Sequence, residues 1–208
     1  MKRGFCALLA AIMLLLITDV PSNVYAVDTD SCNLSQTVYA ELDDGAGNVE
    51  LVSGRLVDSG AVHSSSKIDG AIATYAFDLY AADNTLTTKD SDGAAASTVY
   101  LTIEYKTKNT PTEYLLTRVS GYWKIHVSNV QVTQAYLNYG CNGSFPQIVQ
   151  NQYVNDRSVN NNFSYTTGFT KYVSDVIGSA VGANLRLTYK MGTSRTWSFR
   201  LYNNIVTP

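Results

Sequence analysis

The side chains that most often carry catalysis are scarce in this chain of 208 residues, which has two histidines and three cysteines. His63 stands in a serine-rich stretch, and His126 lies on the polar side of an alternating segment. A serine nucleophile needs a histidine base and an orienting carboxylate, yet neither histidine is accompanied by a Gly-x-Ser-x-Gly motif. We therefore interpret both histidines as surface groups and expect no catalytic residues.

Carboxylates offer a second route to catalysis, because glycoside hydrolysis uses a pair of Asp or Glu side chains. The chain has 17 Asp and Glu residues, and their spacing singles out no pair. A secreted hydrolase that acts on polysaccharide or cell wall through an unidentified carboxylate pair therefore remains the alternative hypothesis.

Metal ligation has little support in the sequence. No His-x-x-x-His, Cys-x-x-Cys or EF-hand spacing occurs, so the common zinc and calcium motifs are absent. The turns at residues 43–50 and 83–92 carry Asp and Asn, whose oxygens suit calcium. These residue types also favour turns for reasons of backbone geometry. We adopt the turn interpretation and expect neither a metal nor another cofactor.

Two cysteines, Cys32 and Cys141, follow the N-terminal apolar stretch that contains Cys6. In an oxidising compartment this pair predicts a disulfide between Cys32 and Cys141. The bridge would close a loop of about 110 residues, which the chain-entropy model values at about 4 to 5 kcal/mol. The alternative is a pair of buried free thiols.

Residues 1–26 have the features of a secretory signal peptide. A short basic start precedes an apolar run at residues 4–17, and the small residues Val24 and Ala26 suit a signal peptidase. The run is shorter than the roughly 18 apolar residues of a transmembrane helix. We therefore expect a cleaved leader, a single domain at residues 27–208, secretion or attachment at the cell surface, and no stable membrane insertion.

Alternation of apolar and polar residues dominates the rest of the chain, and it is clearest from Val99 to Tyr105. Ser120–Gly121, between two β-rich runs, predicts a hairpin turn. Residues 185–201 predict a closing hairpin. Trp123 and Trp197 alternate in phase with apolar neighbours, so both are expected to face the core.

The phase of the alternation shifts near residues 128–129 and 133–134, which indicates bulges or bends. Short strands separated by Gly, Asn and Ser turns are typical of a sandwich. We predict an all-β fold, an antiparallel β-sandwich of roughly seven to ten short strands. A membrane-inserting hairpin at residues 99–127 would explain the same alternation, but a soluble sandwich explains it equally well.

The stretch from Asn142 to Asn162 is rich in Asn and Gln and is long for a connection inside one domain. Aromatic rings beside amides form a surface suited to sugars or to proteins. The predicted ligand-binding residues are Tyr139, Asn142, Tyr153 and Tyr165. The formal net charge is −2, without a long basic run, so nucleic acid is not an expected partner.

Four segments, residues 114–124, 140–143, 162–169 and 197–199, resemble uncharacterised small secreted β-rich proteins of Gram-positive bacteria. The likeness covers about the C-terminal half of the chain and lies in structural motifs. It implies an exported bacterial β domain and carries over no site residues. The leader, the lack of catalytic motifs and the aromatic, amide-rich loops lead us to expect a non-enzymatic secreted β-sandwich that binds a glycan or a protein at or outside the cell surface.

Overall fold

The computed structural model describes residues 37–64, 67–82, 85–87, 95–108, 113–193 and 195–206, which form thirteen β-strands. The predicted signal peptide, Cys32 and most of the Asp-rich stretch at 83–92 lie outside these residues. The strands are β1 (Thr37–Asp43), β2 (Val49–Val52), β3 (Gly54–Ser64), β4 (Lys67–Ala82), β5 (Thr85–Thr87), β6 (Ala95–Lys108), β7 (Glu113–Ile125), β8 (Val130–Asn142), β9 (Tyr153–Ser158), β10 (Phe163–Thr166), β11 (Val173–Ser174), β12 (Ala180–Met191) and β13 (Arg195–Val206).

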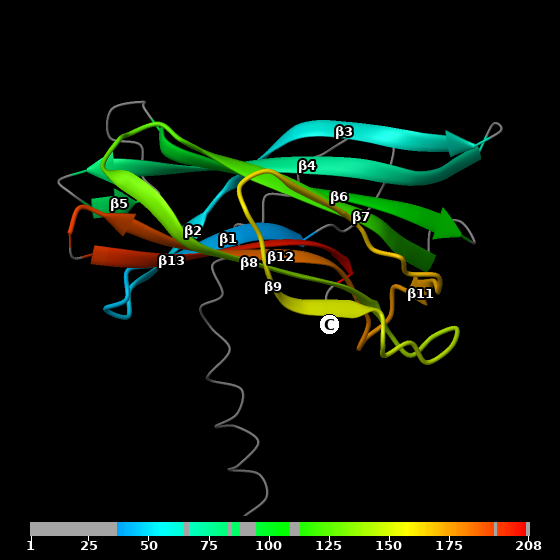
Figure 1. The fold of residues 1–208 in the computed structure, drawn as a ribbon. Helices are drawn as coiled ribbons and strands as arrows, with labels where there is room; N and C mark the ends of the chain where they lie inside the picture. The colour runs from blue at the N-terminus through cyan, green and yellow to red at the C-terminus, as the bar shows by residue number, and fades with distance from the viewer. Residues whose placement is uncertain are drawn as a thin grey trace, which may run out of the picture. The chain divides into compact units, whose positions relative to one another are not determined.

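The strands form two antiparallel sheets, which lie as two layers in Figure 1. Sheet A has the order β2-β1-β13-β12-β8-β9. Sheet B has the order β10-β7-β6-β4-β3, and β5 and β11 pair with β4 and β7 respectively. The predicted all-β antiparallel sandwich is therefore confirmed. The strands are more numerous than expected, and several are long: β4 has 16 residues and β6 has 14.

The core lies between the two sheets, because alternate residues of each long strand point toward the opposite sheet. On β6, Val99, Leu101 and Ile103 are fully buried. Trp123 on β7 and Trp197 on β13 are buried as well, as their phase predicts. Burying one large apolar side chain contributes about 1.5 to 3 kcal/mol, so these long alternating strands are the main source of stability.

Each side of the sandwich carries one edge strand from each sheet. Strands β2 and β3 form one side, and β9 and β10 form the other. The chain crosses from sheet A to sheet B at Ser53, just before Gly54 opens β3. A Cβ on Gly54 would lie 2.6 Å from the ring of Phe77. Glycine therefore lets the crossing chain pass close to this buried ring.

The predicted hairpin turn at Ser120–Gly121 is wrong, because both residues lie inside the unbroken strand β7. Gly121 instead marks a close approach within sheet B. A Cβ at this position would lie 2.6 Å from the carbonyl oxygen of Tyr100 and 2.8 Å from the ring of Phe163. A glycine inside a strand thus serves packing here, although the sequence presents it as a turn.

Both predicted phase changes are present. Residues 126–129 turn the chain from β7 into β8. At Thr133 the ladder between β8 and β12 shifts register, since Gln134 pairs with Thr188 whereas Val132 pairs with Tyr189. Thr133 is therefore the extra residue of a β-bulge. The closing hairpin of β12 and β13 also forms as expected.

Candidate functional site

Two irregular segments, residues 143–152 and 167–179, meet at one end of the sandwich, which we call the loop end. It lies at the lower right of Figure 1. Gly143 and Val149 exchange two backbone hydrogen bonds of 2.9 and 2.7 Å, which close the first segment. The N–H of Ser174 donates to Phe145 O at 3.0 Å and joins the two segments. The expected long loop at 142–162 therefore holds a closed turn and then strand β9.

Gln152 fastens the two segments to each other and to β8. Its Nε2 donates to the carbonyl oxygens of Cys141 and Lys171 at 3.0 and 2.8 Å. Its Oε1 accepts from the N–H groups of Thr170 and Lys171 at 2.8 and 2.7 Å. The buried amide thus uses both of its donors and both acceptor sites. Its role is to hold the loop end in shape.

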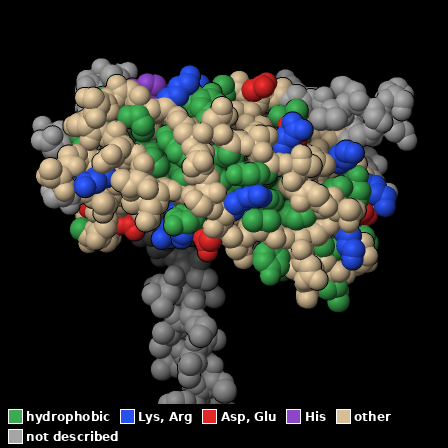
Figure 2. All heavy atoms as spheres, viewed as in Figure 1, with side chains coloured by type: hydrophobic (Ala, Val, Ile, Leu, Met, Phe, Trp, Pro, Cys, Tyr) green, Lys and Arg blue, Asp and Glu red, His purple; other side chains and the backbone are tan. Residues whose placement is uncertain are grey.

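Large apolar side chains of both segments face solvent, with exposed fractions of 58% for Phe145, 69% for Ile148, 40% for Val176 and 99% for Ile177. The last two stand in a turn with two 3.0 Å backbone hydrogen bonds, from the N–H of Val176 to Ser174 O and from the N–H of Ser179 to Val176 O. Figure 2 shows hydrophobic side chains protruding in the region that the loop end occupies in Figure 1. Grouped exposed apolar residues mark contact sites, whereas single ones are ordinary.

A depression of about 350 Å³ lies between the two segments. It is lined by Ile148, Val149, Gln150, Asn151, Gln152, Gly168, Phe169, Thr170 and Lys171. Phe169 and Ile148 supply an apolar wall, and amide groups and the Lys171 ammonium supply a polar edge. None of these lining residues is Asp, Glu or His, so the depression offers no carboxylate pair for glycoside hydrolysis.

Arg157 on β9 brings two of the four predicted ligand-binding residues together. Its Nη1 donates to Tyr139 Oη at 2.9 Å, and its guanidinium lies 3.9 Å from the ring centre of Tyr165. Tyr139 is buried and Tyr165 is half-buried. Because β9 and β10 are the edges of different sheets, the cation–π contact closes this side of the sandwich. Both tyrosines thus have a structural contact.

Asn142 and Tyr153 lie close to the depression but outside its lining. Asn142 Oδ1 accepts a hydrogen bond of 3.1 Å from the N–H of Gln152. Tyr153 is the first residue of β9 and directly follows Gln152. It pairs with Gly140, and its side chain is 52% exposed. Of the four predicted residues, Tyr153 has the side chain best placed to touch a partner.

Cys141 lies on the inner side of β8 and is fully buried. Its Sγ lies 3.5 and 3.7 Å from the carbonyl oxygens of Tyr114 and Lys171 and can donate its one proton to either. Burial raises the pKa of this thiol to about 11. Cys32 lies outside the described residues, so the Cys32–Cys141 disulfide stays a prediction.

His126 is exposed and belongs to a polar chain on the outer face of sheet B. Its Nε2 lies 3.0 Å from Thr98 Oγ1, which donates to Asp78 Oδ1 at 2.6 Å. Asp78 also pairs with Arg55 at 3.5 Å. Thr98 is only 5% exposed, so its hydroxyl is shielded from a substrate. The side chain of His63 lies outside the described part of the chain.

In the Asp-rich turn after β1, the carboxylate oxygens of Asp44 accept hydrogen bonds from groups of the same turn. Asp44 Oδ1 accepts from the N–H groups of Ala46 and Asn48 at 2.8 and 3.1 Å, and Oδ2 accepts from Asn48 Nδ2 at 2.7 Å. The bond from the Asn48 side chain and those from the backbone lower the pKa of Asp44. Within the described residues, no three His, Cys, Asp or Glu side chains converge as metal ligands.

No protein-family model, curated protein or solved structure matches the chain. No helix among the described residues is long and apolar enough to cross a membrane.

The apolar group at the loop end was not evident from alternation. Val176 and Ile177 stand between Asp175 and Gly178, and an apolar pair inside such a polar turn is the signal that marks them. Gln152 and Arg157 carry no comparable signal, because their partners are backbone groups and rings from other strands.

Proposed function

We propose that this chain is a secreted, non-enzymatic binding protein that contacts a partner protein through the loop end. The observation that carries the proposal is the exposure of Phe145, Ile148, Val176 and Ile177 on two segments that one backbone hydrogen bond and the Gln152 amide hold together. Burying such a side chain against a partner would contribute about 1.5 to 3 kcal/mol. The features of a signal peptide at residues 1–26 support secretion.

A protein partner suits this end better than a glycan does. Aliphatic side chains such as Ile148 and Ile177 offer no hydrogen bonds to sugar hydroxyls. Protein interfaces combine an apolar centre with a polar rim, and here Asn151, Lys171 and the exposed Asp175 surround the apolar residues. The depression beside Ile148 would accept one apolar side chain of the partner.

The proposal is tested by capture of proteins from surface and culture fractions of the source organism on the immobilised mature protein. Ile177→Asp and Ile148→Asp place a charge at the loop end. Leu51→Asp is the matched control, because Leu51 is 58% exposed but lies on β2, the opposite edge of sheet A. We expect the wild type and Leu51→Asp to retain one shared protein that both loop-end variants release.

The retained protein is then purified and titrated against each variant by calorimetry. A Kd that rises at least about tenfold for Ile177→Asp, equivalent to about 1.4 kcal/mol, would support the loop end as the contact. Equal affinity for all variants, or a loss of affinity for Leu51→Asp of the same size, would refute it.

A further inference from the structure

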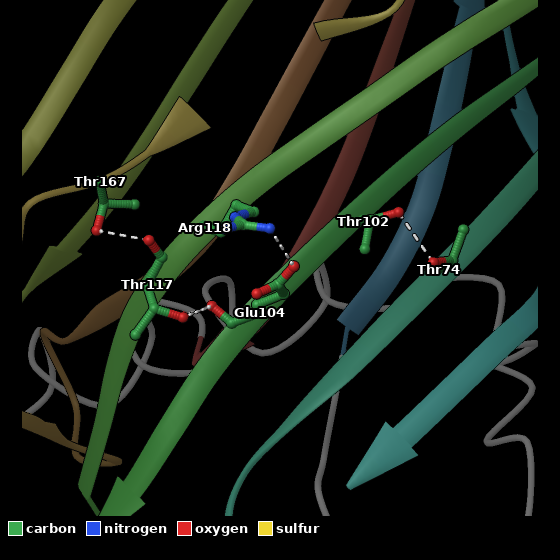
Figure 3. Close-up of polar contacts among 6 residues, drawn as sticks. All are labelled: Thr74, Thr102, Glu104, Thr117, Arg118 and Thr167. Atoms are coloured by element: carbon green, nitrogen blue, oxygen red, sulfur yellow. Dashed lines mark hydrogen bonds and ion pairs between the residues drawn. The ribbon is translucent and has the colours of Figure 1, made fainter. Parts of the chain in front are cut away.

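The outer face of sheet B carries four short hydroxyl side chains in a line, which we call the hydroxyl row. Thr74, Thr102, Ser120 and Ser164 lie opposite one another on the neighbouring strands β4, β6, β7 and β10. The Oγ1 atoms of Thr74 and Thr102 are 2.9 Å apart (Figure 3). Three inter-strand spacings of about 4.8 Å give the row a length of about 14 Å, that of a short oligosaccharide.

A pair of stacked tyrosines flanks the hydroxyl row on one side. Tyr100 and Tyr122 are directly paired between β6 and β7, and their ring centroids are 4.3 Å apart with planes 14° apart. Lys124 Nζ lies 5.8 and 5.7 Å from the two centroids, which holds the stack by cation–π attraction. Both rings are only partly buried. They offer apolar surface to a ligand next to the hydroxyl row.

A charged pair flanks the hydroxyl row on the other side. Arg118 Nη1 lies 3.5 Å from Glu104 Oε1, and Figure 3 shows this pair between Thr102 and Thr117. Thr117 Oγ1 donates to the carbonyl oxygen of Glu104 at 2.9 Å, which ties β7 to β6. In Figure 3, Thr167 also bonds to the carbonyl oxygen of Thr117. The flanking strands are thus fixed in position.

Charges of both signs occur on this face: Lys124 lies over the two tyrosine rings, and two acid–base pairs lie on the same sheet. Glu104 is paired with Arg118, and Asp78 with Arg55 at 3.5 Å. A face without a dominant sign exerts little long-range attraction on a charged ligand. Sugar hydroxyls both donate and accept hydrogen bonds, and so do the Ser and Thr hydroxyls of the row. The chemistry of this face therefore matches an uncharged sugar chain.

We infer that the outer face of sheet B binds a neutral polysaccharide, which runs across the strands along the hydroxyl row with sugar rings against Tyr100 and Tyr122. A protein partner suits this face less well, because protein interfaces centre on well-packed apolar and aromatic anchors. The two most exposed large apolar residues, Ile177 and Ile148, lie at the loop end instead. This sugar site is independent of the proposed protein contact.

The first test is affinity electrophoresis of the mature protein in native gels that contain hydroxyethylcellulose, glucomannan or soluble starch. A gel with hyaluronate is the anionic comparison. We expect at least one of the three neutral polysaccharides to retard the protein more than hyaluronate does. Absence of retardation by all three, or equal or greater retardation by hyaluronate, would overturn the inference.

The second test uses variants with the polysaccharide that retards most. Tyr122→Ala removes part of the stack, and Ser164→Ala removes one exposed hydroxyl without disturbing the core. The matched control is Tyr202→Ala, because Tyr202 stacks on Tyr39 at 4.6 Å on the outer face of sheet A. We expect affinity to fall about tenfold for Tyr122→Ala, to fall measurably for Ser164→Ala, and to stay at the wild-type value for the control.

Thermal unfolding of each variant checks that the fold is intact, and Ser164→Ala keeps the test valid if Tyr122→Ala fails to fold. Unchanged affinity for Ser164→Ala and Tyr122→Ala, or an equal loss for Tyr202→Ala, would refute the site. Ile177→Asp should leave polysaccharide binding unchanged, so failure of this inference and failure of the proposed protein contact give different results.

Discussion

The hydroxyl of Tyr189 on β12 lies 2.8 Å from Oγ of Ser97 on β6, and this hydrogen bond joins the two sheets inside the core. Both side chains are fully buried. A second polar contact joins the sheets nearby, where Asn203 Nδ2 donates to the carbonyl oxygen of Leu101 at 3.3 Å. The two contacts fix how sheet A is placed on sheet B, which apolar packing alone specifies less strictly.

Tyr189→Phe should lower the free energy of unfolding by about 1 to 2 kcal/mol, because the Ser97 hydroxyl is then buried without its partner. Ser97→Ala should cost a similar amount. The double variant should cost less than the sum of the two, since no unpaired hydroxyl remains. Urea denaturation of all four proteins measures these values, and strictly additive losses would contradict a direct contact.

Stability should fall at alkaline pH. Burial raises the pKa of Tyr189 well above its ordinary value of 10.0. The unfolded chain therefore loses this proton near pH 10 while the folded protein keeps it, so the free energy of unfolding is retained below pH 10 and declines as pH rises above it. Unfolding at about pH 8 and about pH 11 should show a smaller decline for Tyr189→Phe. An identical decline in both proteins would assign the effect to other groups.

Periodicity predicted most of the fold because the strands are long and one face of each is buried. The phase of Trp123 and Trp197 placed both rings in the core correctly, and the shift at residues 133–134 marked a real bulge. The error at Ser120–Gly121 has a physical cause. The turn preference of glycine predicts a hairpin at this position. In the structure Gly121 is required because Phe163 of β10 approaches it closely. The residues around Gly121 in the sequence give no sign of this contact, because Phe163 comes from another strand.

The candidate site was predicted only in part, because composition marks loops but not their contacts. The stretch 142–162 does contribute to the loop end. Yet Tyr139 and Tyr165 are engaged by Arg157, and only Tyr153 is left well exposed among the four predicted residues. The exposed Ile177 comes from a separate segment that a backbone hydrogen bond brings alongside. Such pairing depends on the tertiary fold.

Gly121→Ala should destabilise the protein by about 1 to 3 kcal/mol, the usual cost of overpacking. The new Cβ would lie 2.6 Å from the backbone oxygen of Tyr100, which cannot move without breaking the sheet. Gly140→Ala is the control, because its nearest atoms would be 3.4 Å away, an ordinary contact. Thermal denaturation compares the two. Equal melting temperatures would show that β7 moves away from β6 and β10 more readily than the packing implies.

Cys141 should resist alkylation in the folded protein. The buried sulfur has a pKa of about 11, so little reactive thiolate exists at neutral pH. Unfolding without reductant then separates the two hypotheses for this cysteine. The predicted Cys32–Cys141 bridge leaves both residues unlabelled by iodoacetamide until a reductant is added, and mass spectrometry detects the linked peptides. Immediate labelling of Cys141 on unfolding would refute the bridge in the secreted protein.

Gln152→Ala should loosen the loop end while the rest of the sandwich stays folded. The change removes four buried or partly buried hydrogen bonds to backbone groups of Cys141, Thr170 and Lys171, which costs about 2 to 4 kcal/mol. Hydrogen exchange should accelerate at residues 143–152 and 167–179 but not in β6 or β12. Gln150→Ala is the control, because Gln150 lies in the same segment but is exposed. Unchanged exchange in Gln152→Ala would show that the backbone hydrogen bonds between Ser174 and Phe145 and between Gly143 and Val149 are enough to hold the apolar group in place.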